Sequence, residues 1–393
     1  MSDQFYFSRD TKVYITAAGD TATAWEIPVL DGISFSQGTN TSEITLAEMS
    51  NGSGVSRRAR QMFTDSYAPA EWSFSTYMRP FKASHAGATG TWENADVSAE
   101  RQHAVEEVLW AFFVGASTFS QGDAATGTSW NDGITGGTSN MVIDFTASEK
   151  ANLSEIDIYI ELGAATAGND VTYLIKNCAV NEASIDFDID GIATINWAGF
   201  GKIIQEYESN SGNIPNFTKT ITEGTTDTGN FIRNRLTSLT ASATSAGSIV
   251  SSYDLVLTGG NITMSNNLTY LTPETLGIVN QPLSNITGTR TVGGSFTCYL
   301  NHKSTSSADL FEDIIESTDV ITNDFALTFK VGGDSNTPRV EFAMPNCHLE
   351  VPSHSMDDIV SLETTFHALP GIISPSGVDD FEAKVTYVGG SLS

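Results

Sequence analysis

Most of the chain alternates between apolar and polar residues with a period of two, as half-buried β-strands do. In the segment 155–161, for example, three isoleucines fall on one face and the acidic residues fall on the other. Thr, Ser, Gly and β-branched residues are abundant, while Lys and Arg are scarce. The pattern therefore predicts a mainly β (α+β) protein.

Two stretches have helical periodicity. The first begins at Ser98 as N-cap and ends near Gly115, and its apolar residues follow three-four spacing. These residues are Val105, Val108, Leu109, Phe112 and Phe113. The second runs from Ser306 to Ser317 and opens with the capping pair Ser306-x-x-Asp309. Its expected buried residues are Leu310, Phe311, Ile314 and Ile315. We expect each helix to cover a sheet.

The segment Tyr173 to Ile204 recurs without gaps as Phe342 to Ile373, so that Cys178 aligns with Cys347. We call the step along the chain from Cys178 to Cys347 the repeat spacing. Earlier landmarks recur in the same order, among them Leu30 as Leu257 and Phe74 as Phe296. Internal repeats of this kind indicate duplication of a structural unit.

We predict two tandem domains at 1–205 and 231–393, each a β-sandwich or barrel flanked by one helix. A polar linker at 206–230 joins them. The first copy carries the longer connections, near 82–96 and 115–171. We expect a Gly/Ser/Thr-rich surface loop in the latter.

The net charge is −28, because 47 acidic residues outnumber 19 Lys and Arg. So acidic a surface cannot bind nucleic acid by neutralising phosphates, which requires clustered Lys and Arg, and it would repel DNA. No long apolar run predicts a membrane span, and the first residues do not resemble a signal peptide. Three cysteines, two of them repeat equivalents, argue against a disulfide framework and fit a reducing cytoplasm.

The run Asp186-x-Asp188-x-Asp190-Gly191 matches the first half of a calcium-binding loop. The twelfth position, where that loop needs Glu, is Trp197. We therefore favour an acidic strand face, with the three carboxylates opposite Ile185, Phe187 and Ile189.

No set of residues predicts catalysis. Cys347 and His348 are neighbours, so on a strand they point to opposite faces and cannot act as nucleophile and base. No HExxH or paired-CxxC pattern occurs, and the Gly-rich stretches contain no phosphate loop with GKS or GKT. We expect no enzyme activity and no cofactor.

The basic cluster Arg57, Arg58 and Arg60 lies in a long segment, Glu48 to Ala70, which the pattern predicts to be a loop between two strands. On such an acidic chain, a concentrated positive charge suggests contact with an acidic neighbouring subunit. A solvated loop is the alternative.

These features together resemble the tail tube proteins of long-tailed bacteriophages. The resemblance lies in the strand VLDGISFSQG, the loop holding SRRAR, the strand WSFSTYMRP, the helix SAERQHAVEEVLWAFFVG and the closing strands through NWAGFGKII. It covers nearly the whole chain, but no short motif is diagnostic, and most family members carry one such unit. Members with a fused pair form trimeric rings with pseudo-sixfold symmetry.

The resemblance implies a virion protein, assembled in the host cytoplasm, whose rings stack into a hollow tail tube. Its partners would be further copies of itself and other tail proteins (terminator, tape measure, baseplate). DNA would pass through without specific binding. In that setting, Asp186, Asp188 and Asp190 could line the channel or lie on the outer surface. Another virion component built from tandem β-domains, or a carbohydrate-binding or hydrolytic β-protein, remains an alternative.

Overall fold

The computed structural model describes residues 6–44, 61–83, 101–115, 134–136, 140–145, 153–164, 170–207, 214–215, 217, 219–221, 231–243, 252–302, 305–316, 325–333, 338–356, 358–370 and 382–389. Strands account for 62% of these residues and helices for 7%, which confirms the mainly β class.

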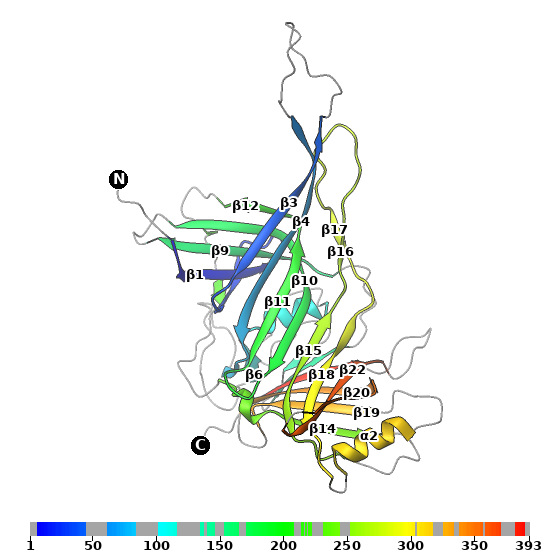
Figure 1. The fold of residues 1–393 in the computed structure, drawn as a ribbon. Coiled ribbons are helices and arrows are strands. Elements are labelled where there is room, and N and C mark those ends of the chain that lie inside the picture. Colours follow the sequence, from blue (N-terminus) through cyan, green and yellow to red (C-terminus); the bar gives the residue numbers. More distant parts are fainter. Residues whose placement is uncertain are drawn as a thin grey trace, which may run out of the picture.

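The largest feature is an antiparallel sheet in which eight of the described strands follow the order β3, β4, β11, β10, β15, β18, β22, β21 (Figure 1). Their bounds are β3 (Ser34–Glu43), β4 (Met62–Tyr77), β11 (Thr194–Gly201), β10 (Val171–Phe187), β15 (Leu257–Ser265), β18 (Thr291–Tyr299), β22 (Val360–Ala368) and β21 (Ser353–Met356). We call this the long sheet. Its strands alternate buried and exposed residues; Trp72, Phe74 and Trp197, for example, point into the core.

Two further sheets complete the core. The first has the order β13, β2, β1, β9, β10, β12, so β10 belongs to it and to the long sheet. Its other strands are β1 (Tyr6–Ala17), β2 (Thr23–Ile27), β9 (Ile156–Ala164), β12 (Ile203–Glu206) and β13 (Lys219–Ile221). The second has the order β14, β19, β20, β23, β8, β7. Its strands are β7 (Ile134–Gly136), β8 (Asn140–Asp144), β14 (Ser238–Ala243), β19 (Phe325–Val331), β20 (Arg339–Leu349) and β23 (Lys384–Val388).

Two short ribbons lie outside these sheets. One pairs β5 (Pro80–Ala83) with β6 (Arg101–Ala104). The other pairs β16 (Thr269–Leu271) with β17 (Ser284–Ile286) in the segment that joins β15 to β18.

Strands from the two halves of the chain pair with each other in the same sheets. In the long sheet β10 pairs with β15, and in the second smaller sheet β8 pairs with β23. One continuous hydrophobic core contains residues of both halves. The proposed boundaries at 205 and 231 stay a prediction.

The first helix is shorter than the periodicity predicted. Helix α1 covers Glu107–Phe113, and 101–104 form strand β6 instead of the expected helical turn. The reason is that Gln102 and His103 are buried beside β5: the side-chain amide of Gln102 donates to the carbonyl of Phe81. Trp110 of α1 lies edge-on against Trp197 of β11, with ring centroids 4.9 Å apart.

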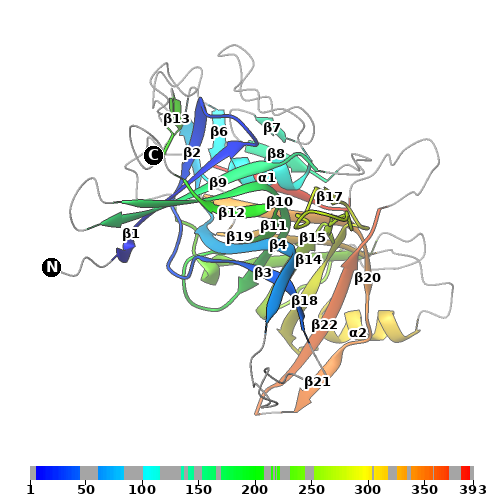
Figure 2. The same ribbon diagram turned by 90° about the horizontal axis from the view of Figure 1, so that it is seen from above.

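The second helix, α2 (Ser307–Glu316), matches its prediction closely. The backbone N–H of Ser306 donates to the carboxylate of Asp309, one half of the expected capping pair. Leu310 is buried and the ring of Phe311 contacts that of His354, with centroids 4.7 Å apart, which places α2 against the β21 end of the long sheet (Figure 2). Ile315, expected to be buried, is 51% exposed because it lies beyond the packed face.

Three expected loops contain strands. The segment from 48 to 70 becomes strand at Met62. The insertion 115–171 contributes β7 and β8 in addition to β9, which the alternation at 155–161 predicted. The segment 206–230 contributes β13, which pairs in parallel with β2. Strands β8, β9 and β13 all pair with strands that are distant in sequence, so local composition could not reveal the pairing.

Candidate assembly surfaces

One end of the long sheet is strand β3, which among the described strands pairs with β4 alone. Nine of its ten residues are polar or Gly, and most of the strand is exposed. Phe35 is the exception: it is half-buried and packs against Tyr173, with ring centroids 5.4 Å apart. An edge of this kind can accept a further strand.

The opposite end of the long sheet is β21, which pairs with β22 alone among the described strands. Its four residues are exposed, and three large apolar side chains in and beside it face solvent. Val351 is 64% exposed, Met356 77% and Ile359 60%. Isolated exposed apolar residues are common, but a group of them on an open strand edge is typical of a protein interface.

The pairing between β10 and β15 shows what such an edge contact looks like when it is complete. Six consecutive residue pairs run from Glu182↔Ser265 to Phe187↔Gly260. Phe187 is only 5% exposed and stacks on Phe329 of β19, with ring centroids 5.4 Å apart. We call this contact the internal seam, because it joins the first half of the chain to the second.

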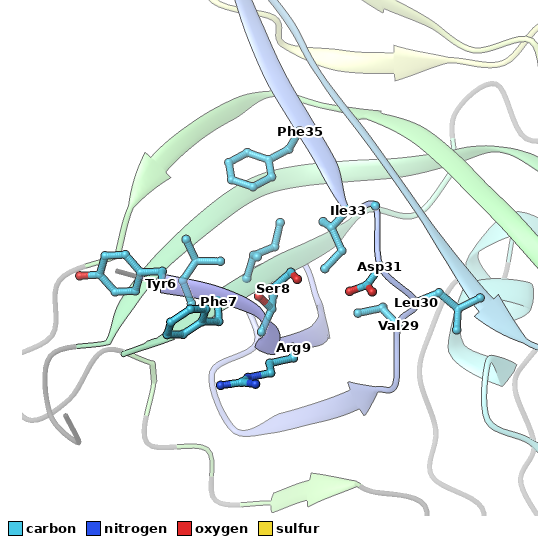
Figure 3. Close-up of a pocket in the computed structure, with 13 residues that line it drawn as sticks. Tyr6, Phe7, Ser8, Arg9, Val29, Leu30, Asp31, Ile33 and Phe35 are labelled. Carbon is cyan, nitrogen blue, oxygen red and sulfur yellow. The ribbon is translucent and has the colours of Figure 1, made fainter. Parts of the chain in front are cut away.

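A cavity of about 310 Å³ opens beside the β3 edge, and we call it the β1–β3 cavity. Figure 3 shows residues Tyr6 to Arg9 of β1 on one side of it and Ile33 and Phe35 on the other. Ile160 and Leu162 of β9 also line it. The walls are mainly apolar, and Arg9 and Asp31 are charged.

The predicted acidic residues are all exposed. Asp186 alternates with buried Ile185 and Phe187, as expected. However, β10 ends at Phe187, so Asp188 and Asp190 lie in the following turn and Ile189 is 52% exposed rather than buried. Asp190 approaches the guanidinium of Arg235 to 3.8 Å. Which of these carboxylates face a channel stays a prediction.

The predicted contact residues Arg57, Arg58 and Arg60 lie outside the described residues. The described segment 272–283 runs alongside β4 through two backbone hydrogen bonds of Asn280. The N–H of Tyr67 donates to the carbonyl of Asn280 at 2.9 Å, and the N–H of Asn280 donates to that of Asp65 at 3.2 Å. Leu276 is 98% exposed and Ile278 65% exposed, so this segment carries an unburied apolar tip.

The sequence pattern did not predict a buried polar cluster that the structure contains. The Tyr387 hydroxyl contacts a carboxylate oxygen of Glu106 and accepts a hydrogen bond from Trp110 Nε1 at 2.8 Å. Burial raises the pKa of Glu106 to about 8. The cluster ties α1 to strand β23, which is close to the other end of the chain. Glu106 has no local signal that separates it from a solvated helical acid.

The cysteines do not form a reactive site. Cys178, Cys298 and Cys347 are buried and unpaired with one another. Burial raises the pKa of Cys298 to about 11 and that of Cys347 to about 12, so these thiols stay protonated near neutral pH. Among the described residues, no group of three or more His, Cys, Asp or Glu could hold a metal ion, and neither helix has the length and apolar content of a membrane span.

Comparison with known proteins identifies one relationship that extends over nearly the whole chain. No protein-family model matches. The tail tube protein pb6 of Escherichia phage T5 is 30% identical over 394 residues, which cover 96% of this chain and 76% of the relative. Both halves of the chain, and both ends of the long sheet, fall within a similarity of this length.

Proposed function

This chain belongs to the phage tail tube proteins and is a structural component of the virion tail; from that premise we propose that three copies form a pseudo-sixfold ring and that the rings stack into a tube that conducts DNA. The observation that carries the proposal is the internal seam, a contact between unlike edges of two similar units. Such a heterologous contact closes a ring when it is repeated around an axis.

Internal duplication is supported by the register of two strand pairs. In β9 and β10, Ile158 lies opposite Ile175. In β19 and β20, Leu327 lies opposite Met344. Along the chain, Leu327 lies one repeat spacing after Ile158, and Met344 lies one repeat spacing after Ile175. The next residue pair is Ile156↔Cys178 in the first case and Phe325↔Cys347 in the second, and these pairs are also one repeat spacing apart. In both strand pairs the register shifts just before this residue pair.

The cysteines strengthen this correspondence. The Cys178 thiol donates to the carbonyl of Ile175 at 3.3 Å, and the Cys347 thiol approaches that of Met344 at 3.7 Å. Each thiol therefore contacts the carbonyl three residues earlier, beside the same irregularity of its strand.

The hairpin β3–β4 corresponds in the same way to the pair β15–β18. Phe35 lies opposite Trp72 in the first, and Ile262 lies opposite Gly294 in the second. The step from Phe35 to Ile262 equals the step that relates the two copies at Leu30 and Leu257. The step from Trp72 to Gly294 likewise equals that from Phe74 to Phe296. We therefore treat β3 and β15 as equivalent edges, and likewise the end of β10 and β21.

The proposed ring closure depends on the positions of β3 and β21 at the two ends of the long sheet. Inside the chain, the end of β10 in the first unit pairs with β15 of the second. The equivalent contact of the second unit joins its β21 to a β3 strand, and these two strands stand at opposite ends of the long sheet. A β3 strand from a second copy supplies the partner, so that three chains provide six similar contacts.

The charge of the chain suits a DNA conduit. With a net charge of −28, a surface of this protein repels phosphate instead of trapping it, so DNA passes without specific binding. As a tail tube protein, the chain assembles with itself and with other tail proteins; we propose the terminator, the tape measure protein and the baseplate as those partners. Assembly takes place in the host cytoplasm.

Electron microscopy of the purified chain tests this function. We expect hollow tubes whose cross-sections contain three chains and six similar lobes. Small closed oligomers that never stack would instead favour a different virion component, such as a decoration or baseplate protein. Monomers at all concentrations would contradict the tube assignment for the isolated chain.

A further inference from the structure

We propose that the β1–β3 cavity is a socket for the next copy of the chain, which inserts Met356, at the tip of its β21–β22 hairpin, beside Ile160. This inference rests on the proposed ring of duplicated units and adds the side chains that define the contact. It follows from a comparison of two cavities in the same molecule.

The second cavity, of about 190 Å³, lies beside β15, and we call it the β14–β15 cavity. Strand register relates the two cavities, because Val13 lies opposite Ile160 just as Leu239 lies opposite Phe329. Six lining residues of one cavity then correspond in order to six of the other. The corresponding pairs are Ser8 and Asn234, Arg9 and Arg235, Thr11 and Thr237, Leu30 and Leu257, Asp31 and Thr258, and Gly32 and Gly259. Four of the six pairs carry the same residue type, so the two cavities are equivalent parts of the two units.

The two cavities differ in one respect. Phe187, Asp188 and Ile189, at the tip of the β10–β11 hairpin, form part of the wall of the β14–β15 cavity. They reach it across the internal seam, and Phe187 is held there by its stack on Phe329. None of the described residues that line the β1–β3 cavity comes from a corresponding hairpin. The smaller cavity is therefore the partly filled form, and the larger cavity is the open form.

The repeat spacing, which relates β10 to β20, identifies the missing side chain. Met356 is the residue of the second unit that is equivalent to Phe187 of the first. In the same way Ile160 of the first unit is equivalent to Phe329 of the second, and Ile160 lines the open cavity. Met356 ends β21 just as Phe187 ends β10. Its 77% exposure in the single chain is consistent with a residue that is buried only on assembly.

Charge at the rim agrees with this placement. In the filled cavity, Arg235 lies 3.8 Å from Asp190 of the hairpin tip. Arg9 occupies the equivalent position of the open cavity, and the incoming hairpin carries the exposed Asp358 next to its tip. An arginine thus faces an acidic hairpin in both cases.

Cysteine cross-linking tests the socket directly. In the internal seam Phe187 pairs with Gly260, so the equivalent contact sets Met356 opposite Ile33 of the next copy. Paired strand residues have Cα separations that a disulfide can span. Assembled rings of the double variant Met356→Cys/Ile33→Cys should form covalent dimers and trimers on oxidation. The native cysteines are buried and should not interfere.

The control variant is Ser353→Cys/Ile33→Cys, which moves one thiol three positions along β21 to a distance of roughly 10 Å. We expect roughly tenfold less cross-linking in this control than in the matched pair. Rings that assemble but cross-link equally in both variants, or in neither, would overturn the socket while leaving the tube function intact. Failure of the parent chain to form rings would contradict the tube function itself.

If the double cysteine variant does not assemble, two further measurements test the socket. Met356→Glu should fold normally, because the side chain is exposed, but should lower ring yield roughly tenfold, whereas Met356→Leu should retain it. An electron microscopy map of parent rings should show Met356 in contact with Ile160 of its neighbour. A cavity that is empty or filled by another segment in that map sinks the proposal.

Discussion

At the scale of single residues, the buried carboxyl of Glu106 is the least expected feature of the molecule. It lies in the core with the Tyr387 hydroxyl as a partner, and it is fully buried. A carboxyl that is removed from water in this way favours its protonated form. The native state therefore holds a proton that the unfolded chain releases.

We predict that this proton makes stability depend on pH. The pKa of Glu106 is about 8 in the folded chain against an ordinary value of 4.5, so its contribution is complete below 4.5 and is lost as the pH rises toward 8. The slope from one group is at most about 1.4 kcal/mol per pH unit. Denaturant unfolding of monomeric protein at pH 5 to 8 should show that Glu106→Gln loses this slope. The control variant Glu312→Gln, which changes an exposed residue, should keep this slope. Equal slopes in the parent chain and both variants would refute the assignment.

Sequence patterns placed some side chains well and failed where a strand ended. Alternation correctly assigned Ile185 and Phe187 to the interior and Asp186 to the exterior. It failed at Ile189, because β10 ends two residues earlier and the period no longer applies in the turn. The repeat also pointed to Cys178 and Cys347 as corresponding residues, which their local contacts support. No pattern revealed the β1–β3 cavity, since its walls come from three separate segments.

At the scale of elements, the sequence predicted strands and helices but not their distant partners. The Gly-rich insertion after α1 contributes β7 and β8, and β8 pairs with β23 near the opposite end of the chain. Composition favours a loop there, whereas the edge of β23 provides a reason to form a strand. For the same reason the segment 101–104 became β6, since β5 offered it an edge.

The basic cluster lies in the segment that joins β3 to β4, and we predict that it contacts acidic residues of a neighbouring subunit. Replacing Arg57, Arg58 and Arg60 together with Ala should reduce tube yield while leaving the monomer folded. Truncating one partner of a buried charge pair costs roughly 2–5 kcal/mol, whereas pairs at an exposed rim contribute little. The triple Lys variant keeps the charge and should assemble better than the triple Ala variant. Unchanged tube yield in the Ala variant would rule out this role.

At the scale of the whole molecule, each chain of the proposed ring contributes two contacts between units, and one of them already lies within the chain. The internal seam forms within the chain, at an effective concentration set by the covalent connection. Only the contact between β21 and β3 then depends on the concentration of free chains. The proposed duplication thus halves the number of contacts that must form between separate molecules.

We predict that the acidic residues at the end of β10 face the channel and ease DNA passage. Changing Asp186, Asp188 and Asp190 to Lys should leave tubes that assemble but should slow DNA ejection severalfold, most strongly at low salt. The matched triple Asn variant removes charge without adding attraction, so it should have a smaller effect. Ejection at the parental rate from tubes built of the Lys variant would place these residues away from the DNA path.

The open ends of the long sheet also bear on how a newly made chain avoids polymerising at random. Unpaired edge strands are the usual templates for aggregation, and within the described part of the chain the long sheet presents one at each end. Both are weak templates: β3 has a single large apolar residue in its ten, and β21 is only four residues long. A pairing this weak adds little to two chains that meet in solution, but in the proposed tube it becomes effective once a ring already in place holds the incoming chains side by side. Purified protein should therefore show a long lag before filaments appear, and preformed tube ends should remove that lag.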